Sequence, residues 1–211
     1  MLEGMTFLRS ATTGDLGPQV TSANLSIRPP QSSDYPAWAE LRARSREFLT
    51  PWEPTWSRDE LSRAAYKRRL RHYQKDLREE TGYAFLIFRR ADGLLVGGLT
   101  LSNVRRGVTQ ATSLGYWMGA PFANRGLMSE AVRAIMPFAF ATLWLHRLEA
   151  ACIPHNLASI RVLERAGFVR EGLARRYLRI NGIWQDHYLY AALADDPRKV
   201  PERDARMAVK V

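Results

Sequence analysis

The chain has 211 residues, 46% of them hydrophobic, which is enough apolar material for one globular domain with a sizeable core. Its formal net charge of +10 favours anionic partners such as phosphates, acidic cofactors or RNA, without choosing among them. We expect a soluble, cytoplasmic protein without a metal, because no apolar run approaches a membrane span or a secretory signal, and one cysteine with four histidines forms neither a disulfide nor a metal-binding pattern.

The two ends of the chain differ in composition from its middle. Residues 1–23 are small and polar without periodicity, and residues 195–211 are rich in charge. We therefore predict a flexible N-terminal leader at 1–23, one folded domain at 24–194, and a charged C-terminal tail at 195–211.

The first half of the domain predicts one strand and two helices. The alternation in "NLSIRP" from Asn24 indicates the strand. The two serines that follow can cap an amphipathic helix, which ends at the prolines of "TPWEP", and a second helix with a basic outer face is expected at about 58–80. The positions expected to face the core are Trp38, Leu41 and Phe48 in the first helix, and Tyr66, Leu70, Tyr73 and Leu77 in the second.

The second half predicts further strands around two helices. "YAFLIF" and "LLVGGLTLS" are typical of an antiparallel hairpin, and "TSLGYWM" continues it as a third strand. A helix follows and is expected to kink at Pro137. "HRLEAACI" then predicts a strand, "PHNLASIRVLERAG" a short helix closed by Gly167, and the last stretch a hairpin around Asn181 and Gly182.

The joint between the third strand and its helix, within "GYWMGAPFANRGLMSEAVRAIM", has the composition of an anion site. A helix that starts after a glycine leaves several backbone N–H groups pointing outward at its positive end. Gly126 allows close approach, Arg125 adds a cation, and Ser129 can cap the helix or donate a hydrogen bond. A plain tight turn is the alternative.

The order of these elements, with an N-x-x-S helix ending in "RAGF", resembles the GNAT family of acetyl-CoA-dependent N-acetyltransferases over about 24–194. That family's loop has the pattern [Q/R]-x-x-G-x-[G/A]; here "ANRGLM" supplies Gly126, with Ala123 and Met128 at the two variant positions. The stretches "REFLTPWEP", "SNVRRG", "LGYWMG", "RGLMSEA", "HRLEAACIPHN" and "YLRINGIWQDH" are similar to RimJ-type ribosomal-protein-alanine N-acetyltransferases.

The resemblance implies an α+β (mixed α/β) fold: a central, mixed but mostly antiparallel splayed sheet of about seven strands, flanked by about four helices. The strands at 112–118 and 146–153 would splay apart, and the pantetheine arm of acetyl-CoA would lie in the gap as an extra strand, with its pyrophosphate on the amides of 124–129. The implied cofactor-binding residues are Trp117, Met118, Asn124, Arg125, Gly126, Leu127, Met128, Ser129, Asn156 and Ser159.

Three residues are candidates for catalysis. Leu163 occupies the position of the tyrosine that many family members use as an acid, so Ser159 is our candidate proton donor for the departing thiolate, unless it only permits helix packing. Asn156 either binds pantetheine or only caps the helix. The base candidates are Glu149, which can instead pair with Arg147 or Arg175, and Glu53, which can instead attract the ammonium group of the substrate.

Arg176 stands where a related enzyme type has a basic glutamate, so that role does not carry over. The expected acceptor-binding residues are Trp52, Glu53, Tyr177, Trp184 and Asp186, with core packing as the alternative for the tryptophans. Cys152 fits buried packing better than a nucleophile, so we expect direct transfer in a ternary complex.

The leading hypothesis from the sequence is acetyl transfer to the α-amino group of an N-terminal alanine, on a ribosomal protein. An α-amino group has a pKa of about 7.7–8.0, against about 10.4 for lysine, so it demands only a weak base. One alternative is a GNAT enzyme that acetylates a small-molecule amine. Another is a ribosome-assembly or RNA-binding factor with little catalysis, whose basic helix contacts ribosomal RNA.

Overall fold

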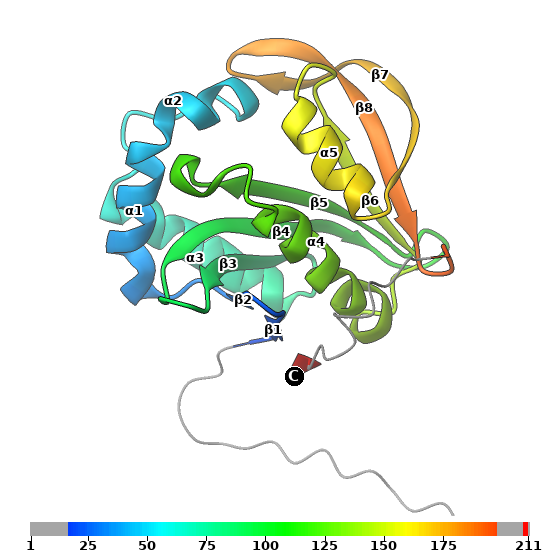
Figure 1. Ribbon diagram of the computed structural model, residues 1–211, viewed down its shortest axis with the longest axis horizontal. Coiled ribbons are helices and arrows are strands. Elements are labelled where there is room, and N and C mark those ends of the chain that lie inside the picture. The colour runs from blue at the N-terminus through cyan, green and yellow to red at the C-terminus, as the bar shows by residue number, and fades with distance from the viewer. Residues whose placement is uncertain (1–16, 198–208, 211) are drawn as a thin grey trace, which may run out of the picture.

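A computed structural model of the chain describes residues 17–197 and 209–210. One sheet has the strand order β7-β8-β6-β5-β4-β3-β2-β1-β9 (Figure 1). Every neighbouring pair is antiparallel except β5 and β6, which are parallel. The mixed, mostly antiparallel α+β fold expected from the sequence is therefore confirmed.

The elements follow each other in the predicted order, with short 3-10 turns at Ser32–Asp34, Thr50–Trp52 and Ala120–Phe122. The strands are β1 (Gln19–Thr21), β2 (Leu25–Arg28), β3 (Tyr83–Arg89), β4 (Leu95–Arg105), β5 (Ala111–Met118), β6 (Arg147–Cys152), β7 (Val169–Ile180), β8 (Ile183–Leu193) and β9 (Val209–Lys210). The helices are α1 (Tyr35–Arg44), α2 (Arg46–Leu49), α3 (Arg63–Arg78), α4 (Leu127–Pro137) and α5 (Leu157–Arg165).

Two apolar clusters hold helices to the sheet. Helices α4 and α5 pack with the strands in the larger cluster, which includes Ile135 and Leu163. Helices α1 and α3 contribute Trp38, Leu41 and Tyr66 to the smaller one, and α3 lies behind the sheet in Figure 1, while α4 lies in front of it. Burying each large side chain of this kind contributes about 1.5–3 kcal/mol.

Local sequence signals explain where several elements begin and end. Gly126 precedes α4 with a left-handed φ of 77°, which glycine adopts without strain. Pro137, where the sequence predicted a kink, is the last residue of α4, and the chain continues as a π-helix at Phe138–Thr142. Asn181 and Gly182 have φ values of 44° and 83°, as a two-residue hairpin turn of type I′ requires.

The structure corrects four expectations. Phe48 is 41% exposed and does not face the core. Helix α3 begins at Arg63 instead of 58, where the Ser62 side chain caps it by accepting a hydrogen bond from Ala65 N–H at 3.0 Å. The sheet has nine strands instead of about seven, and one of them, Gln19–Thr21, lies inside the segment 1–23 predicted to be a flexible leader.

The remaining parts of that leader and of the tail, residues 1–16, 198–208 and 211, lie outside the described residues. Among the described helices, none is both long enough and apolar enough to cross a bilayer.

Candidate active site

The parallel strands β5 and β6 are paired over only part of their length. Three residue pairs join them, and the last is Ser113 with Glu149. Beyond this point β5 continues to Met118 and β6 to Cys152, without pairing to each other. The edge of β5 that faces β6 therefore leaves backbone groups without a strand partner, and such an edge can bind an extended ligand as an added strand.

The loop that follows β5 exposes a row of backbone amides. Gly126 is exposed and left-handed, and its carbonyl accepts the first helical hydrogen bond, from Glu130 N–H at 3.0 Å. Within the part of the chain that the structure describes, the amides of 124–129 have no protein acceptor. Together with the positive end of α4, they form a suitable site for a pyrophosphate. Ser129 does not cap the helix and is buried.

Asn156 and Ser159 lie together at the start of α5. The Asn156 Oδ1 accepts a hydrogen bond from Ser159 N–H at 3.1 Å, so Asn156 does cap this helix. Its Nδ2 group has no acceptor among residues 17–197 and can donate to a ligand amide. Capping and ligand binding are thus compatible for this side chain.

Tyr116 of β5 reaches across to α5. Its hydroxyl oxygen lies 2.7 Å from Ser159 Oγ, where either hydroxyl can be the donor, and 3.3 Å from the Ser159 carbonyl oxygen, an alternative acceptor for its single proton. Burial raises the pKa of Tyr116, although the contact with Ser159 acts in the opposite direction. Burial also raises the pKa of the neighbouring Cys152 thiol to about 11, partly offset by its hydrogen bond with Ser159. Both groups are therefore neutral near pH 7.

A groove of about 410 Å³ borders β5 from the side of α1 and α3. Its lining combines aromatic rings with two carboxylates and two guanidinium groups, a mixture able to hold a peptide end by stacking and by charge. The polar and aromatic residues that line it include Trp38, Arg42, Glu53, Trp56, Glu60, Tyr66, Arg69, Tyr73, Thr100, Tyr116 and Trp117.

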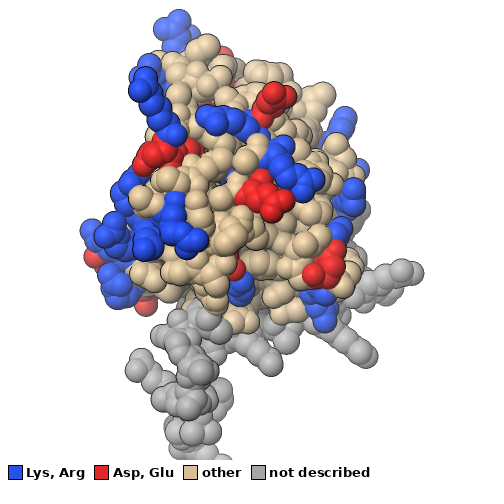
Figure 2. All heavy atoms as spheres, turned by 90° about the vertical axis from the view of Figure 1, so that its left-hand side faces the viewer, with Lys and Arg blue, Asp and Glu red and all other residues tan. Residues whose placement is uncertain are grey.

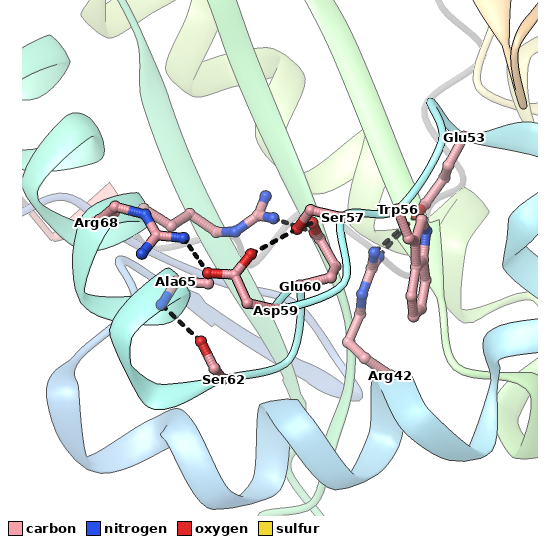
Figure 3. A network of polar contacts seen from close by, with 10 residues as sticks. Arg42, Glu53, Trp56, Ser57, Asp59, Glu60, Ser62, Ala65 and Arg68 are labelled. Atoms are coloured by element: carbon pink, nitrogen blue, oxygen red, sulfur yellow. Dashed lines mark hydrogen bonds and ion pairs between the residues drawn. The ribbon is translucent and has the colours of Figure 1, made fainter.

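Glu53 is firmly held at the edge of this groove (Figure 3). Both of its oxygens accept hydrogen bonds from Arg42 at 2.7 Å, and Trp56 Nε1 donates to Oε2 at 2.8 Å. The Arg42 side chain is only 6% exposed, and its guanidinium lies 5.0 Å from the ring centre of Trp117. Glu53 therefore balances a buried cation, in addition to any role toward an acceptor.

Two more residues of the loop 53–62 form ion pairs, both with arginines of α3. Asp59 pairs with Arg68 and Glu60 with Arg69, each at 2.5 Å. Figure 3 shows the loop between α1 and α3, with Arg42 and Arg68 on its two sides. Glu60 and Arg69 both line the groove, so their ion pair links the loop to α3 at the groove wall.

Glu149 lies where β5 and β6 begin to separate, and it makes two ion pairs. Arg105 donates to one oxygen and Arg147 Nε to the other at 3.0 Å. Arg147, one of the two partners considered from the sequence, also pairs with Glu171. Charge pairing is thus one function of Glu149.

The remaining predicted acceptor residues, Trp52, Tyr177, Trp184 and Asp186, do not line the groove beside β5. The ring of Trp52 packs at a tilt of 48° against that of His155, with ring centres 5.5 Å apart. Trp184 and Asp186 border a separate depression of about 500 Å³, where Asp186 accepts the Arg176 backbone N–H at 2.8 Å. The ring of Tyr177 contacts His187 and is 48% exposed.

The two predicted cofactor-binding residues at the end of β5, Trp117 and Met118, lie on opposite faces of the strand. Met118 packs against the larger core on the α4 side, whereas the Trp117 side chain packs with the cluster of α1 and α3 and lines the groove. Any contact of Trp117 with the cofactor is therefore expected from its backbone.

Sequence reasoning missed Tyr116 and Glu60. The alternation of "SLGYWM" places Tyr116 on the same face as the buried Leu114, which was the available signal for Tyr116. No local pattern distinguishes Glu60, because its place in the groove depends on the course of the loop 53–62.

Comparison with known proteins gives one consistent result. A family model described as an acetyltransferase (GNAT) domain matches residues 24–169. The [ribosomal protein uS5]-alanine N-acetyltransferase of Escherichia coli is 33% identical over 178 residues, which cover 84% of this chain and 92% of that protein. A probable N-acetyltransferase of Bacillus subtilis, YjcK, is 36% identical over 81% of this chain and 94% of its own length.

Two solved structures agree with this result. The ribosomal-protein-S5-alanine acetyltransferase of Vibrio fischeri has a TM-score of 0.78 at 32% identity, covering 84% of this chain and 97% of that one. Mycobacterium smegmatis RimJ, solved in complex with CoA-disulfide, has a TM-score of 0.77 at 32% identity, covering 85% and 87%.

Proposed function

Because the chain belongs to the GNAT family of acetyltransferases, we propose that it transfers the acetyl group of acetyl-CoA to the α-amino group of an N-terminal alanine, on a ribosomal protein. The observation that carries the proposal is the partly paired β5 and β6 next to a loop with free amides. Similar proteins are named for this reaction, which supports the same acceptor here.

The residues present fit acetyl-CoA, which supplies an activated acetyl thioester when bound. The amides of 124–129 and Arg125 would hold its pyrophosphate, while Asn156 Nδ2 and the free edge of β5 would hold its amide-containing arm. This arrangement would place the thioester beside Ser159 and the groove wall. A structural relative solved with a CoA-disulfide supports the same ligand class.

Direct transfer needs few groups from the protein. The amine attacks in its neutral form, the C–S bond breaks with its electron pair on sulfur, and the proton lost by nitrogen is finally taken up by sulfur. Ser159 would donate a hydrogen bond to the departing sulfur. Glu53 and Glu149 remain the base candidates, each acting from within an ion pair.

A protein N-terminus suits the groove beside β5. The oxygens of Glu53 and Glu60, although each carboxylate is paired with an arginine, can accept further hydrogen bonds from an amine, and the tryptophans offer flat apolar surfaces to a peptide backbone. The low pKa of an α-amino group, compared with lysine, matches a site whose carboxylates are already engaged by arginines.

A basic surface supports a ribosomal location for the acceptor. Figure 2 shows Lys and Arg side chains gathered along one border of the face that lies at the left of Figure 1. Helix α3 contributes exposed basic residues, namely Arg63, Lys67, Arg68, Arg71, Lys75 and Arg78. We propose that this surface contacts ribosomal RNA, and a ribosomal acceptor places the reaction in the cytoplasm.

The test is release of free thiol from acetyl-CoA with three matched peptides: one with a free N-terminal alanine, one with a blocked N-terminus, and one with a blocked N-terminus and an internal lysine. The proposal predicts turnover with the first peptide alone. Turnover of small amines instead would favour a small-molecule acetyltransferase. Salt-sensitive binding to ribosomal particles without any turnover would favour an assembly factor.

A further inference from the structure

The contact between Tyr116 and Ser159 joins two elements on opposite sides of the opening between β5 and β6. Tyr116 lies three residues beyond Ser113, the last β5 residue that pairs with β6. Ser159 lies in the first turn of α5, where Asn156 holds its backbone N–H. We propose that Tyr116 is a positioning residue, which donates a hydrogen bond to Ser159 Oγ and so directs the serine O–H toward the leaving sulfur. This role rests on the function proposed above.

Either hydroxyl could donate across this 2.7 Å contact, and the distances and the chemistry of the two groups favour Tyr116 as the donor. A serine hydroxyl has one proton and can accept two hydrogen bonds, so accepting from Tyr116 leaves its own proton for another acceptor. A phenol is the stronger acid and hence the stronger donor, and the 2.7 Å contact to Oγ is much shorter than the 3.3 Å contact to the carbonyl oxygen.

The surroundings keep this pair uncharged. The titratable groups that act on the Tyr116 hydroxyl are Cys152 of β6 and Tyr190 of β8. Burial raises the pKa of each above its ordinary value, so neither carries a charge near pH 7. Cys152 also hydrogen-bonds Ser159, but a neutral thiol is a weak acceptor, so it competes poorly with a departing thiolate for the Ser159 proton.

The pair acts by hydrogen bonding, without ionisation of either hydroxyl. A thiol has a pKa of about 8.5, and a serine hydroxyl is a far weaker acid, so Ser159 stabilises a thiolate by donating a hydrogen bond to it and keeps its proton. Two hydroxyls in series polarise one another, which strengthens the final hydrogen bond in a site of low dielectric. The proton that the sulfur gains is the one that the acceptor nitrogen loses.

The test is the pKa of the CoA thiol bound to the protein, followed by thiolate absorbance in difference spectra against the CoA-free protein. We expect this pKa to be higher in Tyr116→Phe than in the wild type by about 0.7 units, the equivalent of one typical hydrogen bond of about 1 kcal/mol. With acetyl-CoA and the alanine peptide, kcat should fall about fivefold with little change in the KM for acetyl-CoA.

Two comparisons separate positioning from a structural effect. In a Ser159→Ala background, Tyr116→Phe should change the thiol pKa and kcat very little, because Tyr116 acts through Ser159. Tyr190→Phe is the matched control, since this buried hydroxyl donates to Glu164 at 3.3 Å and does not contact Ser159. It should leave the bound thiol pKa unchanged.

If the wild type acetylates the peptide but its bound CoA thiol has the same pKa as in Tyr116→Phe, the positioning role alone is overturned. The same holds if the effects of Tyr116→Phe and Ser159→Ala are additive. A wild-type protein that fails to bind CoA would overturn the proposed function together with this role.

Discussion

Replacing Gly126 with alanine tests the amide loop most sharply. Its φ of 77° is left-handed, and nothing lies within 4 Å of the position that an added Cβ would take, so the substitution introduces backbone strain without a clash. An L-residue in this conformation costs about 1–2 kcal/mol, and 1 kcal/mol corresponds to about 2–4 °C in Tm for a protein of this size. The new methyl group would also obstruct a pyrophosphate on the loop. Loss of one charge-assisted hydrogen bond, about 1.5–3 kcal/mol, raises the KM for acetyl-CoA about tenfold to a hundredfold.

Gly93 provides the matched control. It has a φ of 70° in the turn between β3 and β4, also with nothing within 4 Å of an added Cβ. Gly93→Ala should lower Tm to a similar extent in a thermal melt and leave the KM for acetyl-CoA unchanged. An equal KM in the two variants, measured by thiol release at varied acetyl-CoA, would refute a cofactor role for the loop.

Four further outcomes are expected. If Glu53 or Glu149 is the base, its substitution by glutamine lowers kcat or shifts the pH–rate profile, and two unchanged profiles would remove both from the mechanism. Glu53→Ala should cost about 3 kcal/mol in urea unfolding, because it leaves buried Arg42 unpaired, and Arg42→Met in the same chain should recover part of this loss. Partial burial of Glu130 opposes its ionisation, but hydrogen bonds from Ser22 and Asn24 outweigh it and lower the pKa of this carboxyl. Its stabilising effect is therefore present above about pH 4.5 and is lost as the pH falls through its folded pKa. The difference in free energy of unfolding between the wild type and Glu130→Gln should accordingly become smaller in acid. Cys152→Ala should retain turnover, whereas an acetylated Cys152 trapped during the reaction would contradict direct transfer.

Local signals in the sequence were sufficient for most of the fold. Strand alternation, the Asn181-Gly182 turn and the glycine before α4 act over a few residues, and the structure has each of them where the pattern predicted. The prediction that Phe48 faces the core was wrong because two short helices, α1 and α2, replace the single long helix that the spacing assumed.

The site was less predictable because its contacts join distant parts of the chain. Tyr116 and Ser159 are 43 positions apart in the sequence, and the pairing of Glu53 with Arg42 depends on how the loop 53–62 turns back toward α1. Sequence motifs identified Ser159 and Glu53 individually, but not the residues that they contact. Their partners depend on the splay of β5 from β6 and on the course of that loop, which no short pattern encodes.

The most direct test of acetyl transfer to an α-amine uses one peptide that carries both a free N-terminal alanine and an internal lysine. After incubation with acetyl-CoA and the purified protein, fragment mass spectra locate the acetyl group. We predict one acetyl group per peptide, on the alanine nitrogen. Acetyl on the lysine, or an unmodified peptide when acetyl-CoA is bound, would contradict the account.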